Sequence, residues 1–166
     1  MTSISALNNI HKRGLFGDHQ GKDKNELTNV SEVKHLQIIQ IVQYKKSTIQ
    51  ISSLNLDNLQ FPEVPMQVHS NKETRILWSG PSNWLLVSTK KDILNSVQKI
   101  CDDKNFAVTD LSHSRAIIEL KGSNSKEVLK KGCPININEF KINNCANSIF
   151  HGITITIDMI SNEPET

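Results

Sequence analysis

The chain has 166 residues and a formal net charge of +2, from 19 basic and 17 acidic side chains. This length allows one domain with its own core. The balanced charge, with no basic run longer than two residues, excludes a protein that binds nucleic acid chiefly by electrostatic attraction. The longest apolar runs, such as residues 153–160, are far shorter than the ~20 residues of a membrane span.

The cysteines and histidines point to no metal or disulfide framework. Cys101, Cys133 and Cys145 form no CxxC pair, and the first 30 residues lack the apolar core of a signal peptide. An odd number of thiols without a secretion signal indicates reduced cysteines in a cytoplasmic protein. The six histidines show no HxH or HxxxH spacing, so we expect no dedicated metal site.

The first half of the chain is predicted to be rich in strands. Residues 1–33 are polar and read as a flexible N-terminal arm, followed by a single α+β domain over 34–166. Two β-rich runs, 36–46 and 48–54, predict a hairpin. Prolines at 62 and 65 predict an irregular crossing segment over 55–70. Residues 74–80 and 84–88 then predict a second hairpin with its turn at 80–83.

The second half alternates helices and strands. In residues 90–103 the apolar side chains recur at helical spacing, which predicts an amphipathic helix. Strands are predicted at 106–111, 114–122 and 153–160. A short helix over 125–131 is expected to be capped by Asn124 with Glu127 as its capping-box partner, and to end at a left-handed Gly132.

The order from Trp84 to Ile160 is therefore β-α-β-β-α-β. This order is typical of an α+β fold with a ferredoxin-like split β-α-β-β-α-β core. The predicted N-terminal hairpin would extend that core.

Two sites have residues of the kinds that enzymes use. Lys130 and Lys131 would favour a Cys133 thiolate, but a helix C-terminus opposes it, so a packed thiol is favoured over a nucleophile. His113 lies beside Asp110, Ser112 and Arg115. Neighbouring side chains on a strand point to opposite faces, so a polar strand junction is favoured over a Ser-His-Asp triad.

The remaining motifs do not indicate a nucleotide site. The chain has neither GxGxxG nor GxxxxGK[ST]. Trp78 and Trp84 flank a Gly-Pro turn and could stack on a planar ligand, although core or interface packing is the favoured interpretation. The residues by themselves thus predict a binding module or a structural subunit.

Several blocks nevertheless resemble one known family. They are "SAL" (5–7), "GLFG" (14–17), "TRILWSGPSNWLLVS" (74–88), "FAVTDLSHSRAIIELKGSNSKEVLKKGCPINI" (106–137) and "FKINNCANSIFHGITITI" (140–157). In this order they resemble the gamma subunit of heterotetrameric sarcosine oxidase, and the Gly-Cys-Pro at 132–134 is the most distinctive element. The chain departs from the family at Ser79, usually leucine, and at Asn136, commonly aspartate. It also stops at "SNEPET", without the family's C-terminal strand and helix.

The resemblance implies a fold similar to the folate-binding aminomethyltransferases, such as the T-protein of glycine cleavage. It implies a noncatalytic subunit, without its own cofactor, of a bacterial cytoplasmic complex that oxidatively demethylates sarcosine to glycine. Hydrogen peroxide and either formaldehyde or 5,10-methylenetetrahydrofolate would be the other products. FAD, FMN, NAD, zinc and tetrahydrofolate would be bound by the alpha, beta and delta subunits.

Other functions are open on the sequence alone. The alternatives are a free-standing folate-binding or aminomethyltransferase-like protein and an enzyme that uses Cys133. For a subunit, the candidate interface residues are Arg75, Trp84, His113 and Arg115, because polar and aromatic residues near turns commonly make subunit contacts.

Overall fold

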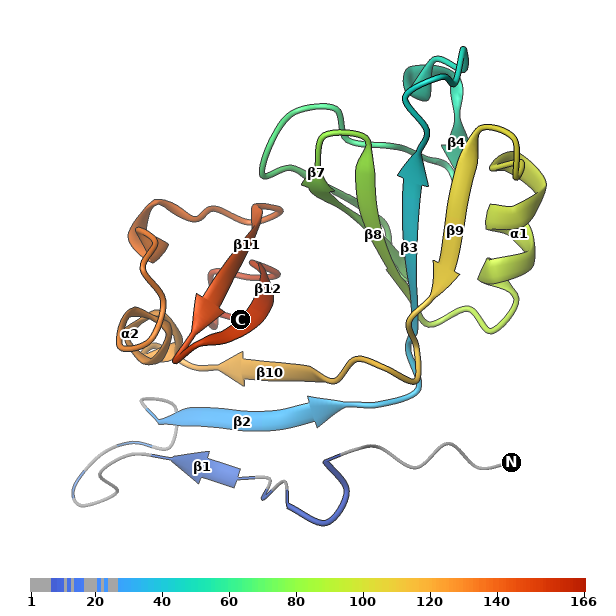
Figure 1. The fold of residues 1–166 in the computed structure, drawn as a ribbon. Coiled ribbons are helices and arrows are strands. Elements are labelled where there is room, and N and C mark those ends of the chain that lie inside the picture. Colours follow the sequence, from blue (N-terminus) through green and yellow to red (C-terminus); the bar gives the residue numbers. More distant parts are fainter. Residues whose placement is uncertain (1–6, 11, 13, 17–20, 22, 24–26) are drawn as a thin grey trace. The chain divides into compact units, whose positions relative to one another are not determined.

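A computed structural model describes residues 7–10, 12, 14–16, 21, 23 and 27–166. The chain divides into two compact units (Figure 1). The central unit is His35–Arg115, and the terminal unit combines the described residues up to Lys34 with Ala116–Thr166. The sequence instead predicts an arm over 1–33 and a single domain over 34–166, so the observed division runs at different boundaries.

The central unit is built on a five-stranded sheet in the order β6-β7-β8-β3-β9. Its strands are β3 (Gln37–Gln43), β6 (Val68–Ser70), β7 (Thr74–Gly80), β8 (Asn83–Ser88) and β9 (Phe106–Asp110). Every neighbouring pair is antiparallel. Since β8 and β9 both run antiparallel to β3 between them, they are parallel to each other, and α1 (Ile93–Ile100) connects them as a split β-α-β unit.

The core of this unit lies between the sheet and α1. Ile39 and Ile41 alternate along β3, and their side chains join Ile93 and Val97 of α1 in one buried cluster. The apolar stripe predicted for residues 90–103 is the face that α1 buries. The predicted 74–80 and 84–88 hairpin is confirmed as β7 and β8.

The predicted hairpin of residues 36–46 and 48–54 is wrong. β3 pairs with β8 and β9, and residues 51–53 form a short 3₁₀ helix, η2 (Ile51–Ser53). The Gln43 amide donates to the Ser47 hydroxyl at 3.2 Å and to the Ile49 carbonyl at 2.7 Å, which holds the intervening segment in a non-strand path. The apolar side chains of this segment pack against the core instead of alternating across a sheet.

The segment 55–70 is irregular only in its middle. β4 (Asn55–Leu56) and β5 (Leu59–Gln60) form a small hairpin, and β6 pairs with β7 at the edge of the sheet. Pro62 and Pro65 both lie between β5 and β6, where no ladder hydrogen bond is needed.

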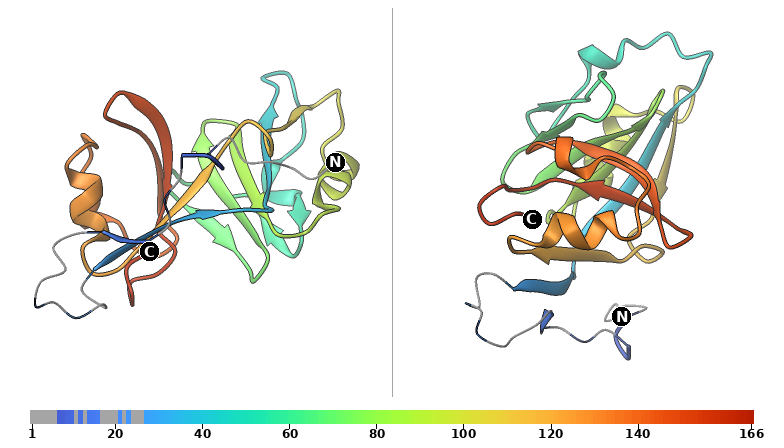
Figure 2. Two further views of the ribbon diagram at one scale, coloured as in Figure 1. Left: turned by 90° about the horizontal axis from the view of Figure 1, so that it is seen from below. Right: turned by 90° about the vertical axis from the view of Figure 1, so that its left-hand side faces the viewer.

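The terminal unit contains two further sheets. β1 (Gly14–Phe16), β2 (Thr28–Val33) and β10 (Ile117–Lys121) form an antiparallel sheet in the order β1-β2-β10. β11 (Cys145–Phe150) and β12 (Ile153–Asp158) form a hairpin, preceded by α2 (Ser125–Lys130) and the 3₁₀ helix η3 (Ile137–Glu139). Figure 2 shows α2 lying alongside this hairpin.

The last residues of the predicted arm are a paired strand. β2 is matched residue by residue with β10, from Val33 opposite Ile117 to Asn29 opposite Lys121. Leu27, Thr28 and Ser31 are buried. The polar composition of residues 28–33 hides this strand, because its pairing is made with residues more than 80 positions later.

The predicted α+β class is confirmed, but the predicted order lacks β11, which pairs with β12, and the strands do not form one ferredoxin-like sheet. β8 and β9 lie in the five-stranded sheet, β10 pairs with β2, and β11 pairs with β12. Among the described residues, no helix is long and apolar enough to cross a membrane.

Candidate functional site

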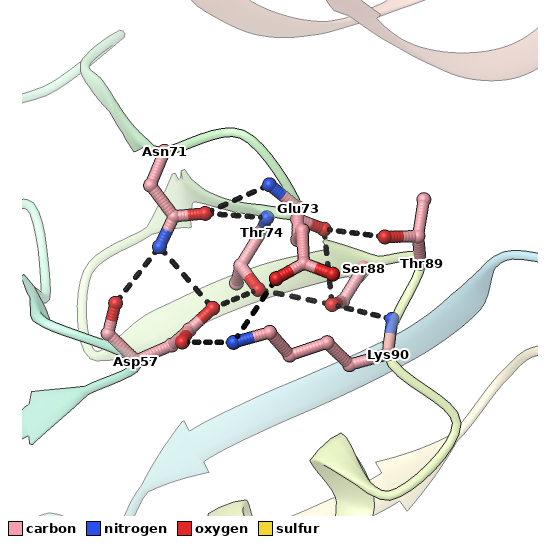
Figure 3. A network of polar contacts seen from close by, with 7 residues as sticks. All are labelled: Asp57, Asn71, Glu73, Thr74, Ser88, Thr89 and Lys90. Carbon is pink, nitrogen blue, oxygen red and sulfur yellow. Dashed lines mark hydrogen bonds and ion pairs between the residues drawn. The ribbon is translucent and has the colours of Figure 1, made fainter.

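A polar network of the central unit surrounds Asp57 (Figure 3). Asp57 and Asn58 form the two-residue turn between β4 and β5, and both have positive φ, at 55° and 62°. Such values are typical of a type I′ hairpin turn, for which Asp and Asn are suited. The pair Asp-Asn between Leu56 and Leu59 is thus a turn signal in the sequence, which the predicted irregular segment over 55–70 overlooks.

The Asp57 carboxylate joins three parts of the central unit. It accepts hydrogen bonds from the Thr74 hydroxyl at 2.6 Å and from the Asn71 amide at 3.2 Å, and it forms an ion pair with Lys90. Lys90 also lies 3.4 Å from the Glu73 carboxylate. The β4–β5 turn is thereby tied to the start of β7 and to the residues that follow β8.

Two buried hydroxyls complete the network. Thr74 and Ser88 are 0% and 1% exposed, and their oxygens lie 2.9 Å apart across the β7–β8 pair. The Ser88 hydroxyl donates to the Glu73 carbonyl at 3.0 Å and accepts from the Lys90 backbone N–H at 3.1 Å. Each buried hydroxyl is thus hydrogen-bonded, as burial in a core requires.

The electrostatics of this network favour a permanent ion pair. Burial raises the pKa of Asp57, but hydrogen bonds from Lys90, Thr74 and Asn71 outweigh burial, so its pKa lies below the usual value. The hydrogen bond to Asp57 raises the pKa of Lys90. Neither group changes its protonation state near neutral pH, so the network acts as a structural tie and not as an acid–base centre.

The structure places Trp84, one of the four candidate interface residues, in the core. Its side chain is 3% exposed, and its indole N–H donates to the Pro62 carbonyl at 2.7 Å. Its ring meets that of Phe61 edge to face, with 5.5 Å between centroids. Trp84 thus packs within the central unit, which is the alternative that the sequence left open.

The other three candidate interface residues lie on two separate elements. Arg75 is half-buried on β7, opposite Val87 of β8. His113 and Arg115 are exposed in the segment that follows β9. Of the four, only His113 and Arg115 offer largely exposed side chains.

The residues from Asp110 to Arg115 form a turn and not a catalytic triad. The Ser112 hydroxyl donates directly to the Asp110 carboxylate at 2.5 Å, and the Ser112 backbone N–H donates to the same oxygen at 2.9 Å. These two hydrogen bonds are the main reason why the pKa of Asp110 is lowered. A weaker electrostatic interaction with His113 acts in the same direction. A triad requires the histidine between the serine and the acid, whereas here the serine contacts the acid itself.

Cys133 is a packed thiol. Burial raises its pKa, and a hydrogen bond with Ser148 only partly offsets this effect. Burial also raises the pKa of Cys101, to about 12, and Cys145 is fully buried. A raised pKa lowers the fraction of reactive thiolate, which argues against a cysteine enzyme.

The helix before Cys133 ends differently from the prediction. Gly132 does not have a positive φ, and Asn124 makes no side-chain cap hydrogen bond at the start of α2. Instead the Gly132 and Cys133 backbone N–H groups both donate to the Leu129 carbonyl, at 3.1 and 2.9 Å. Gly132 is needed for space, because a Cβ there would lie 2.7 Å from two ring carbons of Phe150.

The described residues offer no metal cluster, and two of their surface hollows are acidic. They contain no group of three or more His, Cys, Asp or Glu side chains placed to bind a metal ion. One shallow hollow of their surface is lined by Ser123 and residues 162–165, and another by Gln98, residues 101–103, Phe106 and Val108. Each hollow carries two carboxylates, although Glu165 is paired with Lys126 at 3.6 Å, so neither lining has the excess of positive charge that phosphate groups attract.

A comparison with known proteins identifies the family. Residues 50–163 match the sarcosine oxidase, gamma subunit family. Because this match covers more than half of the chain and includes parts of both units, the chain belongs to the sarcosine oxidase gamma subunit family.

Two curated relatives agree with this assignment. The sarcosine oxidase subunit gamma of Corynebacterium sp. (strain U-96) is 29% identical over 87 residues, which are 51% of this chain and 42% of that protein. The corresponding subunit of Corynebacterium sp. (strain P-1) is 29% identical over 76 residues, which are 45% of this chain and 37% of the relative. The matches therefore span less than half the length of these relatives.

A solved structure has the same fold. It is described as heterotetrameric sarcosine oxidase from Corynebacterium sp. U-96 in complex with pyrrole 2-carboxylate. One of its chains matches with a TM-score of 0.70 and 22% identity, over 80% of this chain and 70% of that chain.

Proposed function

We propose that this chain is a noncatalytic gamma subunit of a heterotetrameric sarcosine oxidase, assembled with alpha, beta and delta subunits in the cytoplasm. The family match over residues 50–163 carries this proposal. The titratable groups support it, since the Asp57–Lys90 pair keeps its charge at neutral pH and burial raises the pKa of Cys101 and of Cys133.

The complex would oxidatively demethylate sarcosine to glycine. Its other products would be hydrogen peroxide and either formaldehyde or 5,10-methylenetetrahydrofolate. FAD, FMN, NAD, zinc and tetrahydrofolate would be bound by the partner subunits, while this chain would supply a scaffold with a fold similar to the folate-binding aminomethyltransferases. The acidic lining of two hollows on the described surface is consistent with that division of labour.

Co-expression with the alpha, beta and delta subunits of the same source tests this proposal. We expect all four chains to elute together with flavin absorbance, and sarcosine-dependent hydrogen peroxide to form only in that fraction. The chain purified alone should neither oxidise sarcosine nor release heat on titration with tetrahydrofolate. Turnover by the isolated chain would refute the noncatalytic role, and tetrahydrofolate binding without assembly would indicate a free-standing folate-binding protein.

A further inference from the structure

β12 is an edge strand of the β11–β12 hairpin. Among the described residues it pairs only with β11, in an unbroken register from Cys145 opposite Asp158 to Phe150 opposite Ile153. Proteins commonly protect such an edge from further pairing with a lysine, a proline or a bulge. Residues 153–157 contain no charged residue and no proline, and their isoleucines and threonines favour strands. This edge is therefore suited to accept one more strand.

The hydrogen bonds beside β12 show which of its backbone groups face outward. Met159 faces β11, because its N–H donates to the Asn144 carbonyl at 2.9 Å and its carbonyl accepts from the Asn143 N–H at 2.9 Å. Residues of an antiparallel strand face its two sides alternately, so the three isoleucines of β12 also face β11. Thr154 and Thr156 then direct their N–H and C=O groups outward. Both are exposed, and no described residue outside the hairpin bonds to their backbone groups.

The sequence of β12 is complementary to itself. Residues 153–157 read Ile-Thr-Ile-Thr-Ile in both directions. If two copies pair antiparallel with Ile155 opposite Ile155 of the second copy, then Ile153 lies opposite Ile157 and Thr154 lies opposite Thr156. In this register the outward-facing threonines meet, as the hydrogen-bonded pairs of an antiparallel ladder require.

The side chains of this register also match. Threonine opposite threonine and isoleucine opposite isoleucine are favourable cross-strand pairs. Ile153, which is 69% exposed, would be covered by Ile157 of the second copy. Asp158 would lie opposite Gly152, so the pairing brings no like charges together.

From these features we infer that two copies of this chain associate through β12 and form a continuous four-stranded antiparallel sheet, in the order β11-β12-β12-β11. The contact is isologous and uses β12 of both copies, so it closes at two copies. Because two short strands bury little surface, the dimer should dissociate on dilution. The inference goes beyond the proposed function and does not depend on it.

The first test is the oligomeric state of the full chain by itself. We expect the mass measured by sedimentation equilibrium to double as the protein concentration rises from micromolar to millimolar. Over the same range the amide protons of Thr154 and Thr156 should become protected from exchange with solvent, because the second copy accepts their hydrogen bonds. The amide of Ile155 faces β11, and its exchange should not depend on concentration.

Two double variants test the register. Thr154→Glu/Thr156→Glu places glutamate opposite glutamate between the copies, and we expect dimerisation to weaken by about tenfold or more. Thr154→Glu/Thr156→Lys is the matched control, because it loses the same hydroxyls, including the Thr156 hydroxyl that donates to Asn147 at 2.8 Å. It places glutamate opposite lysine and should dimerise at least as well as the unmodified chain. In a register shifted by two residues, one of these positions would face itself, and the control would also be weakened.

Several results would overturn the inference. They are a chain that stays monomeric at millimolar concentration, a dimer that the two glutamates leave intact, and a control variant that is weakened as much as the double glutamate variant. The exchange measurement needs no substitution, so the inference can be refuted whatever the stability of the variants. Protection of the Thr154 and Thr156 amides that appears only with the alpha, beta and delta subunits present would show that a partner strand occupies the edge, and would also refute it. Failure of the chain to assemble with those subunits bears on the proposed function alone.

Discussion

At the scale of single residues, Gly132 shows how the family motif is used. Glycine is required there by the closeness of the Phe150 ring and not by a left-handed backbone. The His151 backbone N–H donates to the Gly132 carbonyl at 3.3 Å, so the end of α2 is joined directly to the tip of the β11–β12 hairpin. The Gly-Cys-Pro element is therefore a packing joint, with Cys133 buried beside it.

Gly132→Ala should destabilise the protein. The added Cβ would lie 2.7 Å from the Phe150 ring and 3.0 Å from the His151 ring, so these side chains or the hairpin must shift, at a cost of about 1–3 kcal/mol in the free energy of unfolding. Gly14→Ala is the control, because nothing lies within 4 Å of its added Cβ. Urea unfolding measures both, and equal stability of the two variants would contradict the close-packing role.

Asp57 leads to a prediction about pH. Asp57→Asn removes the ion pair with Lys90, and at pH 7 we expect a loss of about 1–2 kcal/mol in the free energy of unfolding. The folded-state pKa of Asp57 lies below its ordinary value of 3.8. The stability that Asp57 contributes is therefore complete above 3.8 and is lost as the pH falls through the lower folded-state pKa.

The difference between wild type and Asp57→Asn should thus be largest near neutral pH and shrink below about pH 4. Unfolding by urea at a series of pH values measures it. Asp103→Asn, a change of an exposed carboxylate, controls for general charge effects. A constant difference down to about pH 2.5 would show that the carboxylate charge is not what stabilises the network.

At the scale of elements, the sequence predicts those whose pattern is local. The β7–β8 hairpin follows from two alternating runs around a Gly-Pro turn, and α1 follows from one apolar stripe. Residues 48–54 show a similar apolar alternation, yet Ile49, Ile51 and Leu54 pack partly buried against the core without pairing as a strand. Periodicity records which side chains are buried, and it cannot show whether the backbone is also paired.

Elements and contacts that depend on distant residues could not be predicted. β2 is polar, and its pairing with β10 joins positions more than 80 residues apart. The Asp57 network links positions 57, 74 and 90. Nothing in the types of these side chains marks them as partners in the sequence.

Trp84 connects β8 to the loop between β5 and β6. Its replacement therefore tests how strongly these two elements are held together. Trp84→Phe keeps an aromatic ring but removes the donor to the Pro62 carbonyl. Leaving this buried carbonyl without its partner should cost about 1–3 kcal/mol, read as a lower melting temperature. Tyr44→Phe, which removes a hydroxyl from an exposed ring, should change the melting temperature little, and equal effects of the two substitutions would contradict the core role of Trp84.

At the scale of the whole molecule, β1 and β2 belong to the terminal unit. The terminal unit is assembled from both ends of the chain, since β2 lies between β1 and β10 in one sheet. Gly122, just after β10, lies so close to the Leu27 carbonyl that a Cβ would come within 2.5 Å of that oxygen. An arm that merely extended from a folded domain would make no such contact.

Two truncations test this organisation. Removing residues 1–33 deletes β2 and leaves β10 without its described partner strand, so the amide protons of β10 that bond to β2 should exchange rapidly with solvent. Removing residues 1–26 keeps β2, and those amides should stay protected. The central unit has its own core between the sheet and α1, so the amides of β3 should remain protected in both. Equal protection of β10 in the two truncated chains would mean that residues 1–33 act as a dispensable arm.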